Sequence, residues 1–99
     1  NGIYVSSYVS VPVCKCIEKH GKKNEIVVIG QDLYPELVEK LLNGSLNATI
    51  FQDQYLQGRK AVAMMYGLLT DNRETSAVEY LVTPQLVLTS NLSCYKNRY

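Results

Sequence analysis

The segment at residues 25–30 (EIVVIG) constrains the fold more than any other part of the sequence. Its centre is apolar and β-branched without polar alternation, which is typical of a strand covered on both faces. Strands of this kind belong to parallel sheets, whose connections usually run through helices. The segment therefore predicts an α/β fold with a helix on either side of it in the sequence.

A helical pattern precedes this segment. Residues 10–20 place apolar side chains on one face, with Ser10 suited to cap the helix and Gly21 suited to end it. Before that, residues 2–6 alternate apolar and small side chains and favour a strand. The chain up to residue 30 is therefore expected to run strand, helix, strand.

A second and clearer helical pattern follows the apolar segment at residues 25–30. Pro35 fits the first helical position and Gly44 the position just after the last turn. Glu36 and Lys40 are spaced to form an ion pair on the exposed face. The opposite face carries a single apolar stripe, made of Leu37, Val38, Leu41 and Leu42.

The rest of the chain continues the alternation. Residues 47–51 predict a short strand, and residues 55–70 predict a helix that is apolar on more than one side. Residues 71–76 predict a polar loop, and residues 77–82 and 86–89 predict strands. This order predicts a parallel sheet with flanking helices.

Composition excludes several classes of partner. The 99 residues suffice for one small domain, and 46% hydrophobic with 19% charged residues is typical of a soluble globular chain. A net charge of +1 gives no electrostatic reason for this segment to bind nucleic acid or anionic lipid directly. No run approaches the ~20 apolar residues that cross a bilayer, so no membrane partner is expected.

Polar and aromatic side chains follow three of the predicted strands. In parallel sheets, ligands bind beyond the carboxyl ends of the strands, so these loops are expected to share one edge. Carboxylate, amide and hydroxyl groups hydrogen-bond a polyhydroxylated ligand, and aromatic rings stack on its apolar faces. The candidate ligand-binding residues are Ser7, Tyr8, Asp32, Gln52 and Tyr55.

Each candidate also has a structural interpretation. Asp32 could serve only to shape the turn before the next helix, and Gln52 could satisfy backbone groups at a strand end. Tyr8 and Tyr55 could be packing residues. Asp53 is expected to interact with Arg59 or to cap the following helix rather than to contact ligand.

Catalytic, metal and cofactor sites are not expected. The single histidine, His20, falls at a helix end, where a cation favours the carbonyl dipole. Cys14 and Cys16 would point about 200° apart on a helix and cannot easily share a metal. With Cys94 they are expected to be buried apolar side chains of a reducing compartment. No nucleophile elbow or phosphate-binding loop is present, so the sequence predicts no enzyme and no cofactor.

Residues 25–62 combine a Gly-X-Asp-X-X-Pro-Glu pattern at 30–36 with Asn-Gly at 43–44 and Ala-Thr-Ile-X-Gln at 48–52. In this combination the segment resembles the type I periplasmic-binding-protein superfamily. That group includes ribose-binding-like transport receptors and the effector domains of lac-repressor-type regulators. The likeness extends more loosely over the whole chain, through NGIYVSS at its start and YLVTPQLVLTSNL near its end.

The resemblance implies a two-lobed fold of which residues 1–99 form the carboxyl-terminal part of a ligand-binding domain. Residues 1–52 and 77–90 would lie mainly in the carboxyl-terminal lobe, and the helix at 55–70 would pack in the other lobe. Asp32 then matches an aspartate that binds sugar hydroxyls, and Gln52 matches a hinge glutamine that does likewise. Many sugar binders have Asn-Asp where this chain has Ser7 and Tyr8, so a larger or stacked sugar is expected.

The resemblance leaves two functions open. The first is the effector domain of a lac-repressor-type transcriptional regulator, which senses a sugar by lobe closure. It would be a cytoplasmic homodimer that binds DNA through an amino-terminal domain outside this sequence. The cysteines and the polar tail favour it. The alternative is an extracytoplasmic sugar-binding receptor of an ABC transporter, in the periplasm, which LYPELVEKLLNG resembles more.

Overall fold

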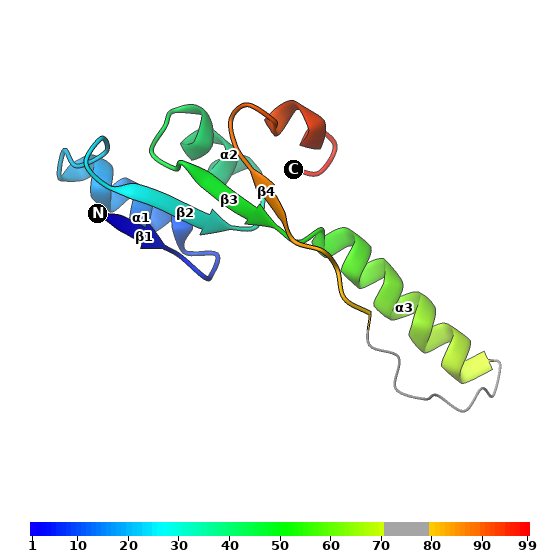
Figure 1. The fold of residues 1–99 in the computed structure, drawn as a ribbon. Helices are drawn as coiled ribbons and strands as arrows, with labels where there is room; N and C mark the ends of the chain where they lie inside the picture. Colours follow the sequence, from blue (N-terminus) through cyan, green and yellow to red (C-terminus); the bar gives the residue numbers. More distant parts are fainter. Residues whose placement is uncertain (71–79) are drawn as a thin grey trace. The chain divides into compact units, whose positions relative to one another are not determined.

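The computed structural model describes residues 1–70 and 80–99 (Figure 1). They divide into two compact units: a first unit of residues 1–51 and 84–99, and a second unit within residues 52–83. The elements of the first unit are β1 (Gly2–Tyr4), α1 (Ser10–Lys19), β2 (Val27–Gln31), α2 (Pro35–Leu42), β3 (Ala48–Phe51), β4 (Gln85–Val87) and the 3-10 helix η1 (Leu92–Tyr95). The second unit contains α3 (Gln54–Thr70).

The sheet has the strand order β1-β2-β3-β4. β1 pairs with β2 and β2 pairs with β3, both in parallel, which confirms an α/β fold with a mostly parallel sheet. β4 differs from the expectation because it runs antiparallel to β3. The chain leaves the first unit after Phe51 and re-enters it at Pro84, and Phe51 is paired with Gln85. β4 therefore starts beside the end of β3 and runs back along it.

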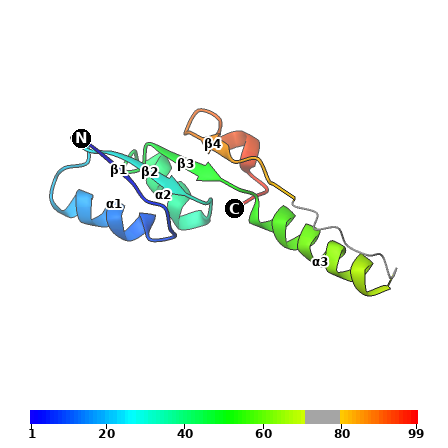
Figure 2. The same cartoon turned by 60° about the horizontal axis from the view of Figure 1, so that its bottom comes forward.

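Helices α1 and α2 lie side by side against the same face of the sheet (Figures 1 and 2). Their apolar faces bury Cys14, Leu37 and Leu41 over Val28 of β2. Gly30 lets α1 approach closely, because an added Cβ there would lie 2.9 Å from the Ser10 hydroxyl oxygen. These contacts form the hydrophobic core of the first unit.

The opposite face of the sheet is largely uncovered by the described residues. Val27 of β2 is 52% exposed, Tyr4 of β1 56%, and Leu86 of β4 54%. The expectation that residues 25–30 are covered on both faces is therefore not met within this part of the chain. Parallel strands are normally covered on both faces.

The ends of α2 are as predicted, but the start of α1 is not. Pro35 occupies the first helical position, and Gly44 follows the helix with a φ of 80°, in the left-handed region that favours glycine. The prediction that Ser10 caps α1 is wrong, since Val9 holds that position. Ser10 is fully buried in the first turn, where its hydroxyl donates to the Ser7 carbonyl at 3.3 Å.

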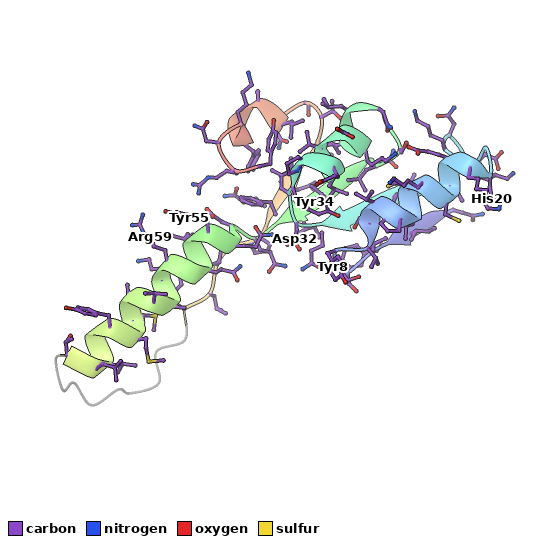
Figure 3. All side chains as sticks on the ribbon, turned by 180° about the vertical axis from the view of Figure 1, so that it is seen from behind. Tyr8, His20, Asp32, Tyr34, Tyr55 and Arg59 are labelled. Atoms are coloured by element: carbon purple, nitrogen blue, oxygen red, sulfur yellow. The ribbon has the colours of Figure 1, made fainter. Side chains whose placement is uncertain are left out.

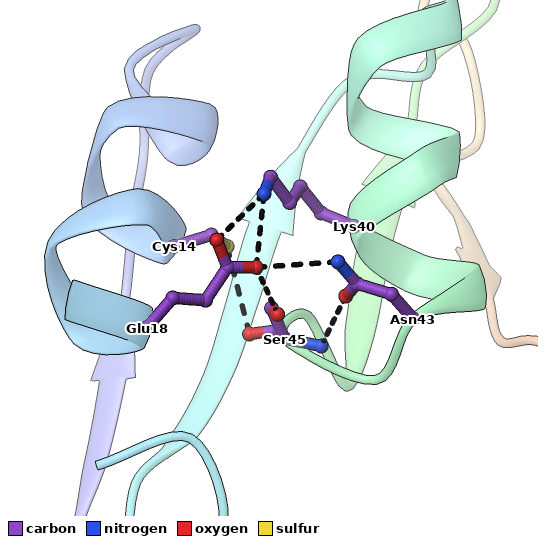
Figure 4. A network of polar contacts seen from close by, with 5 residues as sticks. All are labelled: Cys14, Glu18, Lys40, Asn43 and Ser45. Carbon is purple, nitrogen blue, oxygen red and sulfur yellow. Dashed lines mark hydrogen bonds and ion pairs between the residues drawn. The ribbon is translucent and has the colours of Figure 1, made fainter. Parts of the chain in front are cut away.

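A polar network joins α1 to the end of α2 (Figure 4). The Glu18 carboxylate accepts hydrogen bonds from Lys40 Nζ at 2.8 and 2.9 Å, from Asn43 Nδ2 at 3.2 Å and from the Ser45 hydroxyl. Lys40 first, and then Ser45, lower the pKa of Glu18 from 4.5 to about 2. The predicted pairing of Lys40 with Glu36 is therefore wrong. The lysine instead holds two helices together.

Helix α3 confirms the predicted helix at 55–70 and has no buried residue. Tyr55, Val62 and Leu69 are each more than 70% exposed, although a helix apolar on several sides is usually covered by a partner. No helix in residues 1–70 and 80–99 is long and apolar enough to span a membrane. Of the strand predicted at 77–82, residues 77–79 lie outside the described residues, and residues 80–82 form no strand.

Candidate functional site

The turn after β2 holds Asp32 by its backbone. The Asp32 amide donates to the Ile50 carbonyl at 2.8 Å, and its carbonyl accepts from the Thr49 hydroxyl at 2.7 Å. Thr49 is fully buried in β3. The conformation of this turn is therefore fixed by the neighbouring strand.

Asp32 has a φ of 74°, in the left-handed region that few residues other than glycine, asparagine and aspartate adopt. This supports the interpretation that an aspartate here shapes the turn. The side chain is only half-buried, so its carboxylate can also reach solvent. The two roles are compatible, and the ligand role remains a prediction.

The loop after β1 carries Ser7 and Tyr8, which are both exposed. The Tyr34 hydroxyl donates to the Tyr8 carbonyl at 2.9 Å and so ties this loop to the turn that follows Asp32. Figure 3 shows Tyr8, Asp32 and Tyr34 at the same end of the sheet. The Tyr8 side chain is 78% exposed and is not a packing residue within the first unit.

The remaining candidates belong to the second unit. The Gln52 carbonyl accepts from Gln57 Nε2 at 2.7 Å. Asp53 accepts from the Leu56 amide at 3.0 Å, which confirms its predicted role as a cap of α3. Tyr55, on the first turn of α3, is 73% exposed.

The structure thus brings Ser7, Tyr8 and Asp32 together in the first unit and places Gln52 and Tyr55 in the second. Sequence reasoning did not identify Tyr34 or Thr49 as supports of these loops. Thr49 lies inside the quoted Ala-Thr-Ile-X-Gln pattern, so its buried hydroxyl was a usable signal. The partner of Tyr34 lies 26 positions earlier, and no local pattern indicates it.

The single histidine and the cysteines are the other side chains that were considered from the sequence. His20 Nδ1 hydrogen-bonds the Cys16 carbonyl at 2.8 Å at the end of α1, as expected for a helix-end histidine. Cys14 is buried, and burial raises the pKa of its thiol. Cys16 and Cys94 are exposed, so the prediction of buried cysteines is wrong for these two. Within the described ranges, no three histidine, cysteine or acidic side chains gather in a group that could hold a metal ion.

The sequence matches the model of the periplasmic binding protein domain over residues 1–73. The chain therefore belongs to the periplasmic binding protein family, and the predicted resemblance is confirmed. Its fold is that of part of a two-lobed protein of this class. No curated protein is significantly similar to it in sequence.

Solved structures with this fold include sugar-binding proteins. GanP, a glucose-galactose binding protein from Geobacillus stearothermophilus, is 27% identical, with a TM-score of 0.81 over 93% of this chain and 32% of its own. An ABC transporter solute binding protein from Agrobacterium vitis with bound D-fucose is also 27% identical, with a TM-score of 0.82 over 93% of this chain and 31% of its own.

A putative LacI transcriptional regulator from Bacteroides fragilis shares the fold at 20% identity, with a TM-score of 0.82 over 96% of this chain and 32% of its own. The chain spans about a third of the length of each of these three proteins. Both kinds of protein considered from the sequence, the sugar-binding receptor and the regulator, therefore occur among the structures that resemble it.

Proposed function

We propose that this chain is the carboxyl-terminal part of a two-lobed protein that binds a sugar and has no enzymatic activity. The observation that carries the proposal is the likeness, at 27% identity over 93% of the chain, to a glucose-galactose binding protein and to a receptor with bound D-fucose. The exposed groups that end β1 and β2 on one edge of the sheet support it, since ligands of parallel sheets bind there.

In this proposal the ligand-binding groups are the Asp32 carboxylate, the Ser7–Tyr8 loop, Gln52 and Tyr55. Asp32 and Gln52 hydrogen-bond sugar hydroxyls, and Tyr8 and Tyr55 stack on the sugar ring. Residues 1–52 and 77–90 belong mainly to one lobe, and α3 packs in the other. Ligand closes the lobes by contacting both.

The regulator is the first candidate for the whole protein: an effector-binding domain of the lac-repressor type, cytoplasmic and homodimeric, with DNA bound through an amino-terminal domain. Cys16 and Cys94 are exposed free thiols, which suits a reducing compartment. The fold of the Bacteroides fragilis regulator is compatible with this candidate. The second candidate, a periplasmic receptor of an ABC sugar transporter, is supported by the 27% identity to an ABC transporter solute binding protein with bound D-fucose, which exceeds the 20% identity to the regulator.

The test is calorimetric titration of the full-length protein with pentoses, hexoses and disaccharides. Binding of at least one sugar is expected, and Gln52→Ala should weaken it about 2- to 12-fold, the value of one neutral hydrogen bond. Gln85→Ala, an exposed glutamine of β4, is the matched control and should bind like the wild type. The proposal is wrong if no sugar binds. Sugar-dependent release of operator DNA would favour the regulator, and an amino-terminal signal peptide the receptor.

A further inference from the structure

Tyr34 joins two of the candidate loops through its side chain. It immediately precedes Pro35, in an extended conformation with φ −150° and ψ 161° at the start of α2. Its ring packs against the core of the first unit. The hydroxyl then reaches the carbonyl of Tyr8 at 2.9 Å, across 26 positions of sequence.

The Tyr8 carbonyl that accepts from Tyr34 lies directly before the start of α1. The cap position of this helix, Val9, has no side-chain hydrogen bond. The Tyr34 phenol instead donates to the Tyr8 carbonyl, directly before this cap position, and so holds the chain where α1 begins.

The phenol remains a donor at neutral pH. Burial, followed by the negative charges of Glu36 and Asp32, raises the pKa of Tyr34 above its ordinary value of 10. A raised pKa favours the neutral form, so the proton that bonds the Tyr8 carbonyl is present throughout the physiological range.

We propose that Tyr34 is a positioning residue for the ligand site: its hydroxyl holds the Ser7–Tyr8 loop beside the Asp32 turn before ligand arrives. This inference rests on the proposed function. The buried Thr49 hydroxyl fixes the other side of the arrangement through the Asp32 carbonyl. A loop held in its binding conformation avoids the entropy cost of ordering it when ligand binds, and so increases affinity without touching ligand.

The experiment compares Tyr34→Phe with the wild type in the full-length protein, using the sugar that the wild type binds most tightly. Tyr34→Phe keeps the ring and removes only the hydroxyl, so the ligand-free melting temperature should change little. The affinity should fall about fivefold, the value of one neutral hydrogen bond. Hydrogen exchange at the amide of Val13, which donates to the Val9 carbonyl at 3.2 Å, should become faster. Tyr95→Phe is the control, because the Tyr95 ring packs edge-on against Phe51. It should change neither the affinity nor the exchange rate.

A double-mutant cycle separates positioning from general destabilisation. If Tyr34 acts through the loop that carries Tyr8, its effect on affinity should largely disappear in a Tyr8→Ala background. Unchanged affinity in Tyr34→Phe, or effects of the two substitutions that add fully, would overturn the inference while leaving the proposed function standing. Absence of sugar binding by the wild type would overturn both.

Discussion

Gly30 offers a direct test of how α1 is seated on the sheet. A Cβ at this position would lie 2.9 Å from Ser10 Oγ, 3.2 Å from Ser10 Cβ and 3.3 Å from Leu46 Cδ1. The end of the Leu46 side chain can shift, but Ser10 Cβ is fixed to the backbone of α1 and cannot move without shifting the helix. Overpacking of this kind costs about 1–3 kcal/mol, and the lower unfolded-state entropy of alanine offsets about 0.4–1 kcal/mol. Gly30→Ala should therefore destabilise the protein by about 1–2 kcal/mol.

The assay is urea unfolding of Gly30→Ala, Ser10→Ala and the double variant. Ser10→Ala removes the nearest clashing atom, so the double variant should be more stable than the sum of the two single effects predicts, by about 1 kcal/mol. Ser10→Ala by itself should destabilise the protein little, since it loses only the 3.3 Å hydrogen bond to the Ser7 carbonyl. Additivity within about 0.5 kcal/mol would refute the reasoning. So would a Gly30→Ala variant as stable as the wild type.

Two further predictions concern buried and partly buried polar groups. Thr49→Val should lower the free energy of unfolding by about 1–3 kcal/mol because the Asp32 carbonyl loses its donor. Thr49→Ser keeps that donor and should cost about 1 kcal/mol in urea unfolding; the reverse order would contradict the account. Glu18→Gln should lower the urea midpoint at pH 7. Because the folded pKa of Glu18 is about 2 against an ordinary 4.5, its contribution is full above pH 4.5 and lost as the pH falls to about 2. A midpoint difference that stays constant from pH 7 to 2 would contradict this.

The elements that sequence reasoning predicted well are those with strong local signals. Pro35 and Gly44 bound α2 because a fixed φ suits the start of a helix and a positive φ its end. The cap assigned to Ser10 failed because burial against Gly30 outweighed its capping preference. The predicted pairing of Lys40 with Glu36 failed because Lys40 pairs with Glu18 instead. Glu18 lies on another helix, so spacing along α2 could not indicate it.

In the candidate site, too, features with a local signal were predictable and features that depend on distant contacts were not. The position of Asp32 at the carboxyl end of β2 was predictable, because it directly follows an apolar strand in the sequence. Its positive φ was not predictable, since it depends on hydrogen bonds to Thr49 and Ile50 of a later strand. The contact of Tyr34 with the Tyr8 loop depends on how two helices pack and leaves no trace in local periodicity.

The most direct test of the central claim is the affinity of Asp32→Asn for the sugar that the wild type binds. Asparagine tolerates the φ of 74° but carries no charge, so the turn should be kept while a charge-assisted hydrogen bond is lost. The account predicts binding about 10- to 150-fold weaker, with a melting temperature close to that of the wild type. Asp32→Gly, which also tolerates the turn, should show the same loss. Wild-type affinity in Asp32→Asn would show that this aspartate only shapes the turn, and would contradict the account.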